Sequence, residues 1–343
     1  MNARGRGGFV LVAALWLLVA LGAVGLDAAL RSRTRRLAAA NQLDETRARE
    51  AALAGTEYAR SRLTAAMLDR ADELRSDALS RARSNRAQRR AATSSVRSLF
   101  RRSDPAEDPW REPQELVVPD MLFGDARYTL NLRDTGEALN LNDADGDVLR
   151  RFFAQGLRLD YAHADRLAQA ILDWRDEDEL PRVNGGEREQ YLREHMPMLP
   201  PNRDFAELDE LRHVMGMTPE LYRAARPYLT VIGSGDVNVN AAPEPVLLAL
   251  PSMTPAAVAE LLRLRESGET PRNSNQLRAI LPASVRAAID ADLERFDRMT
   301  TFTTNEVEIR ADGRVEGSPI QARARVIVAR SNTGAVVVWR KVE

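Results

Sequence analysis

Residues 9–26 read FVLVAALWLLVALGAVGL, an uncharged apolar run of eighteen residues. A run of this length and composition is long enough to be a minimal membrane-spanning helix. It also suits the apolar core of a cleaved secretory signal, for which Ala23-Val24-Gly25 supplies a loose small-x-small cleavage site. The sequence on each side of the run decides between these two interpretations.

The downstream sequence favours a helix that is kept in the mature protein. No proline occurs between Asp27 and Leu79, and leucines recur there among charged residues. We therefore predict that the membrane segment and a soluble rod form one continuous helix. Arginine counts alone do not orient this helix, because more arginines follow the run than precede it. The arginines that follow are Arg31, Arg33, Arg35 and Arg36, and those that precede are Arg4 and Arg6.

The composition describes a globular chain without obvious catalytic machinery. The 343 residues are 44% hydrophobic and 29% charged, which suits about two domains. The formal net charge of -1 gives no global field for nucleic acid, and the absence of cysteine excludes disulfides and cysteine zinc sites. The three histidines are far apart, and no nucleophile elbow, P-loop or dinucleotide fingerprint joins a strand to a helix. We expect no catalytic residues and no enzymatic activity.

Alternating apolar residues predict strands at both ends of the soluble part. The first is ARYTLNLR, residues 126–133, and Asp134-Thr135-Gly136 ends it as a turn. An antiparallel meander follows near the C-terminus, with turns at Asp312-Gly313 and Asn332-Thr333-Gly334. Its strands are predicted at 301–310, 320–329 and 335–342. The helical sequence between them, residues 134–300, predicts an α-helical domain inserted into a small α/β domain.

The predicted insertion contains an internal repeat. Leu139-Asn140-Leu141-Asn142 and Val237-Asn238-Val239-Asn240 each precede a helical stretch, and we expect their asparagines to cap those helices. The second copy resembles a helix-hairpin-helix, a motif that often holds DNA phosphates. Its hairpin is Pro251-Ser252-Met253-Thr254-Pro255, and prolines lack the N–H groups that bind phosphate. The pattern therefore favours helix packing over DNA binding.

Residues 81–113 are rich in arginine and serine and then in proline, which predicts a frayed helix end and a solvated linker. Binding of nucleic acid or anionic lipid is the alternative for this basic stretch.

Residues 173–191, DWRDEDELPRVNGGEREQY, are the most chemically suggestive part of the chain. Asp173 and Asp176 lie three residues apart at a predicted helix end, Asp178 follows, and a Pro/Asn/Gly turn brings the chain back to Glu187. Clustered carboxylates without histidine or cysteine favour a hard, oxygen-seeking cation, above all calcium. A solvated acidic turn is the alternative interpretation.

The N-terminus resembles the class III leader of type IV pilins and type II secretion pseudopilins. A short basic leader ends at the junction Gly8-Phe9, directly before the apolar run. The resemblance implies that prepilin peptidase cuts between these two residues, so that the membrane helix is retained. Most pilin-like chains carry glutamate at the fifth mature position, where this chain has Ala13. A buried lone carboxylate is costly without a partner in the subunit ahead, so the missing glutamate suits a subunit at the tip of a filament.

Several further segments resemble the K-type minor pseudopilin family of type II secretion systems (GspK). They are residues 139–142, the motif AILDW at 170–174, the acidic turn to Glu187 and Tyr191, Pro201-Asn202-Arg203 with Phe205, and residues 237–241. This family is α+β: a pilin-like long N-terminal helix packed on a small antiparallel sheet, with a large inserted α-helical domain. The resemblance implies calcium near Asp173, Asp176, Asp178 and Glu187. The chain departs from the family in lacking a cysteine pair and in its long basic stretch.

The domains expected on this basis are a leader (1–8), a transmembrane part (9–26), a pseudopilin domain (27–133 and 301–343, with the basic linker 81–113) and the insertion (134–300). The implied location is the bacterial inner membrane, crossed once, with a cytoplasmic N-terminus and a periplasmic bulk.

The implied role is to prime or cap the tip of a pseudopilus that exports folded proteins across the outer membrane. The implied partners are the H, I and J types of minor pseudopilin, the inner-membrane secretion platform and prepilin peptidase, and no nucleic acid. The alternative is a membrane-anchored helix-hairpin-helix protein that binds nucleic acid in a DNA-uptake system.

Overall fold

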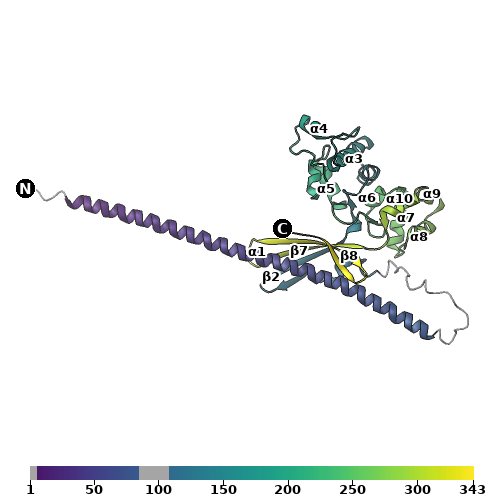
Figure 1. Ribbon diagram of the computed structural model, residues 1–343, viewed down its shortest axis with the longest axis horizontal. Coiled ribbons are helices and arrows are strands. Elements are labelled where there is room, and N and C mark those ends of the chain that lie inside the picture. The colour runs from purple at the N-terminus through teal and green to yellow at the C-terminus, as the bar shows by residue number, and fades with distance from the viewer. Residues whose placement is uncertain (1–5, 85–107) are drawn as a thin grey trace, which may run out of the picture.

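The computed structural model describes residues 6–84 and 108–343 (Figure 1). Helix α1, Arg6–Ser84, is one unbroken α-helix of 79 residues, as the sequence predicted. At 1.5 Å per residue it is about 120 Å long. Its N-terminal half extends away from the rest of the molecule, and its apolar part is long enough to cross a membrane by length and composition. The C-terminal half packs on a sheet.

The sheet has five strands in the order β1-β2-β7-β8-β9, and every neighbouring pair is antiparallel. The strands are β1 (Asp120–Phe123), β2 (Ala126–Asp134), β7 (Glu306–Val315), β8 (Gln321–Ser331) and β9 (Gly334–Val342). One face is apolar because every second residue of β2, β7 and β8 is buried against α1. The predicted fold class, a long helix on a small antiparallel sheet with an inserted helical domain, is confirmed.

Small residues let α1 lie close to the sheet. A Cβ on Gly55 would lie 2.8 Å from Cδ2 of Tyr128, and a Cβ on Gly313 would lie 1.9 Å from the carbonyl oxygen of Ala48. Both glycines therefore mark points where the backbone of one element almost touches the other.

Gly313 also explains an error in the sequence analysis. The pair Asp312-Gly313 was predicted to be a hairpin turn, but both residues lie inside β7, where Gly313 pairs with Tyr128 and Ala322. The glycine accommodates the approach of α1, not a turn. The predicted strand 301–310 is also displaced: β7 begins at Glu306, and residues 300–301 form a separate short strand that pairs with residues 237–238.

The predicted linker 81–113 is also partly wrong. Residues 85–107 lie outside the described residues, and α1 continues to Ser84. From Asp108 onward the chain is packed: Trp110 is fully buried and its Nε1 donates a hydrogen bond to the carbonyl of Leu63, 2.9 Å away. The short 3₁₀ helix η4 (Pro113–Leu116) and then β1 follow, and β1 was not predicted because its residues do not alternate.

The segment between β2 and β7 forms a helical body beside the sheet (Figure 1). Its helices are α2 (Gly146–Arg151), the π-helical η6 (Phe152–Gly156), α3 (Tyr161–Arg175), α4 (Arg188–Arg193), α5 (Pro219–Ala225), α6 (Glu244–Ala249), α7 (Pro255–Glu266), α8 (Ser274–Ile280), α9 (Ala283–Ala291) and α10 (Leu293–Met299). Three short 3₁₀ helices complete it: η5 (Thr135–Glu137), η7 (Leu208–His213) and η8 (Arg226–Tyr228). The body has its own apolar core, which includes Phe152, Phe153 and Trp174.

The helical body begins and ends at one place on the sheet. Asp134, at the end of β2, is the register partner of Val307, near the start of β7. The buried carboxylate of Asp134 accepts hydrogen bonds from Asn238 (2.7 Å) and Thr304 (2.7 Å), one on each side of the junction. These contacts fix the body to the sheet where the chain leaves and returns.

Two short parallel strand pairs reveal that the helical body contains one unit twice. The pairs are β3 (Leu139–Asn140) with β4 (Leu229–Thr230), and β5 (Val237–Asn238) with β6 (Thr300–Thr301). In each unit the side-chain oxygen of the first asparagine accepts the N–H of the second, at 3.0 Å from Asn142 to Asn140 and at 3.0 Å from Asn240 to Asn238. The repeat seen in the sequence is therefore a structural repeat.

The second asparagine of each unit ties distant loops together. The amide of Asn142 donates to the carbonyls of Phe205 and Val231, and that of Asn240 donates to those of Pro271 and Phe302. The expectation that the asparagines cap helices was wrong. Asp145 caps α2 through its side chain, and Pro243 occupies the corresponding position before α6. The asparagines instead satisfy carbonyls that would otherwise be buried without a partner.

Candidate metal centre

The acidic stretch lies between two helices at one end of the helical body. Helix α3 ends at Arg175, residues 176–187 form a loop, and Glu187 precedes α4. In the second unit of the body, residues 267–273 form the loop after α7, the helix that corresponds to α3. The acidic loop is therefore longer than its counterpart in the second unit.

The loop brings three of the four predicted ligands together. Asp176, Asp178 and Glu187 each offer a carboxylate oxygen within 4.8 Å of the others. Glu187 is only 2% exposed, and neither of its oxygens has a hydrogen-bond partner among the described residues. An unpartnered buried carboxylate costs free energy, so this arrangement calls for a cation or a proton.

The fourth predicted residue, Asp173, is engaged otherwise. It is fully buried, and its carboxylate accepts hydrogen bonds from the guanidinium of Arg182 (2.7 Å) and from the backbone N–H of the same residue (3.1 Å). Arg182 also pairs with Asp176. Sequence reasoning missed Arg182, the positive charge that partly balances this acidic group, because an arginine in an acidic turn looks like an ordinary solvated side chain.

The glycines Gly185 and Gly186 let the loop fold back on α3. A Cβ on Gly185 would lie 2.1 Å from the Oδ2 of Asp173, and one on Gly186 would lie 2.9 Å from the Cε of Met215. The sequence signal Asn-Gly-Gly was read as a turn, and the structure shows that close packing also requires it.

The electrostatics of the group follow from burial and repulsion. Burial, and then the negative charges of Asp173 and Asp176, raise the pKa of Glu187 to about 7. Burial also raises the pKa of Asp173, although the hydrogen bonds from Arg182 oppose this change. A divalent cation bound between these carboxylates would reverse the effect on Glu187, because an opposite charge favours the ionised form.

The donor set fits calcium. All three grouped side chains present carboxylate oxygens, which hard cations prefer, and calcium would need further oxygen ligands besides these three to reach its usual six to eight. Both unpartnered oxygens of Glu187 are free to bind, whereas Asp173 would act by holding Arg182 and the loop in place.

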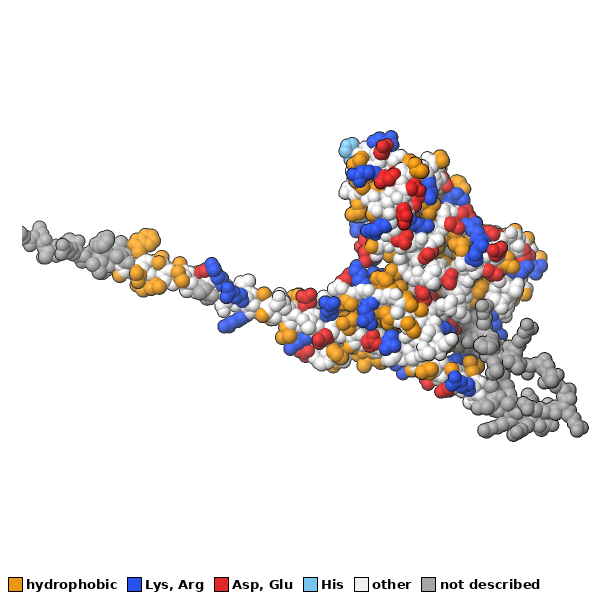
Figure 2. Space-filling model, in the orientation of Figure 1, with side chains coloured by type: hydrophobic (Ala, Val, Ile, Leu, Met, Phe, Trp, Pro, Cys, Tyr) orange, Lys and Arg blue, Asp and Glu red, His pale blue; other side chains and the backbone are white. Residues whose placement is uncertain are grey.

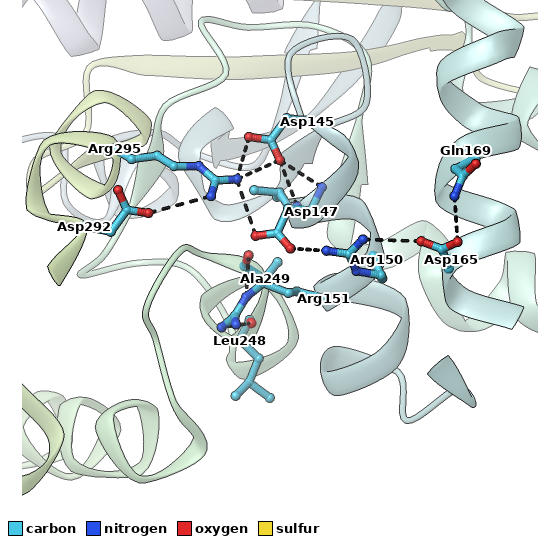
Figure 3. A network of polar contacts seen from close by, with 11 residues as sticks. Asp145, Asp147, Arg150, Arg151, Asp165, Gln169, Leu248, Ala249, Asp292 and Arg295 are labelled. Carbon is cyan, nitrogen blue, oxygen red and sulfur yellow. Dashed lines mark hydrogen bonds and ion pairs between the residues drawn. The ribbon is translucent and has the colours of Figure 1, made fainter. Parts of the chain in front are cut away.

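A polar network anchors the loop to the helical body. The side chain of Asn184 donates to Asp165 (2.9 Å), and the backbone N–H of Asn184 donates to Gln169 (2.8 Å). From Asp165 the network continues across the body to α10 through ion pairs. Figure 3 shows its members: Arg150 between Asp165 and Asp147, and Arg295 between Asp145, Asp147 and Asp292. The loop is thus held on one side by fixed polar contacts.

The N-termini of α3 and α7, one in each unit, show why phosphate binding there is disfavoured. At the N-terminus of α3 the side chain of Asp160 accepts the N–H of His163, and at that of α7 the hydroxyl of Thr254 accepts the N–H of Ala257. These caps occupy N–H groups that a phosphate would need, and Asp160 adds a negative charge.

The residues of the expected cleavage junction and Ala13 lie at the start of α1. Gly8, Phe9 and Ala13 are all within the first eight residues of the helix. The structure therefore places the expected cleavage junction on continuous helix.

Comparison with known proteins identifies the segment that contains the acidic loop. Residues 129–234 match the family model described as type II secretion system (T2SS), protein K. Type II secretion system protein K of Dickeya chrysanthemi is 38% identical over 81 residues, which are 24% of this chain and 22% of that protein. The putative type II secretion system protein K of Escherichia coli K12 is 27% identical over 139 residues, 38% of this chain and 42% of that protein. The chain thus spans less than half the length of the curated relatives it matches.

A solved structure matches over a larger part of the chain. It is a chain in the crystal structure of the GspK-GspI-GspJ complex from the type 2 secretion system of enterotoxigenic Escherichia coli, with a TM-score of 0.54 and 18% identity. The match covers 80% of this chain and 99% of that one, and it shows a shared fold.

The fold and the acidic loop together define a pilin-like protein with an inserted helical domain. Within that class, residues 129–234 match the protein K family of type II secretion systems, in agreement with the resemblance noted in the sequence.

Proposed function

We propose that this protein is a minor pseudopilin that sits at the tip of a type II secretion pseudopilus and primes or caps its assembly. The observation that carries this proposal is the position of the helical body. It contains the protein K segment, and it projects sideways from the C-terminal half of α1, while the N-terminal half of α1 is left free to pack with other helices (Figure 1). We propose a structural role, not a catalytic one.

The shape suits the end of a filament better than its middle. Pilin-like subunits stack through their N-terminal helices, and a body broader than the sheet beside α1 obstructs a further subunit on that side. Ala13 agrees with this placement, because a subunit with nothing ahead of it has no partner for a buried glutamate. Prepilin peptidase would cut between Gly8 and Phe9, leaving the bulk of the chain in the periplasm.

The proposed partners are other minor pseudopilins of the H, I and J types and the inner-membrane platform. The related fold in the GspK-GspI-GspJ complex supports the I and J types as partners. The apolar part of the free N-terminal half of α1 is the surface that contacts them in this proposal, since its residues from Ala14 to Leu26 are all exposed.

Removing the helical body tests the capping role. Asp134 and Val307 are register partners, so a short Gly-Ser linker between Thr135 and Asn305 replaces the body without straining the sheet. In cells that depend on this protein for secretion, we expect the shortened chain to reach the membrane but to leave few pseudopili and little exported protein. A chain that keeps the body, with the same linker added at both junctions, is the control. Normal pseudopili with the shortened chain would refute the proposal.

We also propose that the acidic loop binds calcium. In calorimetry of the full chain in detergent, calcium should raise Tm relative to a sample in EDTA, because only the folded loop assembles the ligands. Asp176→Ala should abolish this rise, since it removes one of the three grouped carboxylates. Glu189→Gln is the matched control, because Glu189 is an exposed acid two residues from Glu187 and outside the group. Equal Tm values for the wild type with and without calcium would exclude the site.

A further inference from the structure

The exposed half of α1 carries a group of arginines just beyond the apolar run. Arg31, Arg33, Arg35 and Arg36 are all exposed, and Figure 2 shows a group of basic side chains on this part of the helix, just after its apolar segment. Arg31 forms an ion pair with Asp27, at 2.8 Å. Within the part of the chain that the structure describes, no carboxylate pairs with the other three. This group of four arginines, the arginine band, therefore carries about three uncompensated positive charges.

Besides carrying positive charge, the arginine band borders a hollow on the surface of the helix. A surface hollow of about 430 Å³ is lined by Arg31, Ser32, Arg35, Arg36 and Ala39. Its small residues, Ser32 and Ala39, leave room between the long guanidinium side chains. Such a hollow offers several N–H donors at once, which suits an anionic oxygen group such as a phosphate.

The arginines are not confined to one face of the helix. At about 100° per residue, the four side chains leave the axis at roughly 0°, 200°, 40° and 140°. A protein partner would contact one face of the helix, whereas a shell of lipids contacts all sides. The distribution around the axis therefore favours lipid as the occupant.

The position of the arginine band along α1 also agrees with lipid as its binding partner. Arg31 lies 22 residues after Phe9, or about 33 Å at 1.5 Å per residue, and Arg36 lies about 40 Å after it. A hydrocarbon core about 30 Å thick, with headgroups extending it to about 40–45 Å in total, ends near the start of the band. Helical side chains also lean toward the N-terminus, so the guanidinium groups reach back toward the phosphates.

We propose that the arginine band of α1 binds the headgroups of anionic phospholipids in the membrane leaflet it faces, and so fixes how far α1 protrudes from the bilayer. This inference rests on the membrane anchorage in the proposed function. It explains why more arginines follow the apolar run than precede it. For a helix with a cytoplasmic N-terminus, the usual bias of cations toward the cytoplasmic side predicts the opposite distribution. The anionic headgroups offset the positive charge of the arginines that lie on the outer side of the membrane.

Electron spin resonance of the full chain in phosphatidylcholine bilayers tests the proposal with spin-labelled lipids. The readout is the preference of the protein-bound lipid shell for phosphatidylglycerol over phosphatidylcholine. We expect a clear preference for the wild type and a loss of most of it in Arg33→Gln/Arg35→Gln/Arg36→Gln, at up to about fivefold for each arginine near the surface. The preference should also weaken at high salt.

The matched control is Arg49→Gln/Arg166→Gln/Arg314→Gln, which removes the same charge from exposed arginines elsewhere and should keep the preference. Equal preferences in the wild type and the band variant would overturn the proposal. So would complete suppression of the preference by millimolar inorganic phosphate, which would identify a site for free phosphate. Resistance of each variant to alkaline extraction from the membrane is measured alongside. If the wild type is extracted, the membrane anchorage itself fails; if it resists extraction but shows no lipid preference, only the role of the band fails.

Discussion

At the scale of single residues, the carboxylate of Glu308 shows how charge is handled on the outer face of the sheet. It is 5% exposed and accepts hydrogen bonds from Arg310 (2.8 Å) and Arg325 (3.0 Å). Burial alone would raise its pKa, but the hydrogen bond and charge of Arg310, together with Arg325, hold the pKa below its ordinary value. The ion pairs outweigh the cost of burial because two cations share one carboxylate.

Glu308→Gln should therefore destabilise the protein in a pH-dependent way. A lowered pKa in the folded state means that the stabilisation is present above the ordinary pKa of glutamate and is lost as pH falls through the folded value. We expect a loss of about 2 kcal/mol at pH 7, because the substitution leaves two arginines without their shared partner. The difference from the wild type in urea unfolding should shrink below about pH 4. A difference that stays constant between pH 7 and pH 3 would contradict this assignment.

Single residues also show how much of the candidate metal centre could be predicted from the sequence. The clustered acidic residues and the Gly-Gly turn in the sequence indicated the loop and the three carboxylates that it groups together. The position of Arg182 against Asp173 was not predictable, because it depends on how the loop folds back on α3. The repeated asparagine pattern was recognised as a repeat, but the role of Asn142 and Asn240 was not predicted, because the carbonyls to which they donate come from segments distant in sequence.

At the scale of elements, the contact of α1 with β7 is controlled by one glycine. Gly313→Ala would place a methyl group 1.9 Å from the carbonyl of Ala48, and neither backbone can yield without separating the helix from the sheet. We expect a loss of about 3 kcal/mol in the free energy of unfolding, in the range of overpacked cores. Gly22→Ala is the control, because a Cβ there meets nothing within 4 Å. Equal stability of the two variants would show that α1 does not lie as close to β7 as described.

The elements themselves were predictable to different degrees. Alternation identified β2, β8 and β9, and the long proline-free segment identified α1. The start of β7 and its passage through Asp312-Gly313 were not predictable, because local turn chemistry points to a hairpin there. The packing of α1, which is distant in sequence, overrides that local preference.

At the scale of the whole molecule, Asp108 joins the three parts of the structure. Its side chain accepts hydrogen bonds from the backbone N–H of Trp110 (2.9 Å) and of Thr304 (3.2 Å), and it pairs with Arg330. Trp110 reaches α1, Thr304 lies where the helical body returns to the sheet, and Arg330 belongs to β8. This carboxylate therefore connects helix, body and sheet at one buried point.

Asp108→Asn should loosen this connection. The substitution removes the charge that faces Arg330 and replaces an oxygen acceptor by a donor, so we expect a loss of about 2–3 kcal/mol. Limited proteolysis should detect faster cleavage near Thr304 in the variant than in the wild type. Glu112→Gln, at an exposed acid on the same segment, is the control. Unchanged stability and cleavage in Asp108→Asn would show that the junction does not depend on this carboxylate.

The shared exit and return of the helical body also bear on the order in which we expect the chain to fold. Strand β2 cannot pair with β7 until the intervening segment has brought their ends together, and closing so long a flexible loop carries an entropic cost that grows with its length. A body that has already folded holds Asp134 and Thr304 within hydrogen-bond distance and removes that cost. We therefore expect the helical body to fold first, from its own local contacts, and the central strand pair to form afterwards.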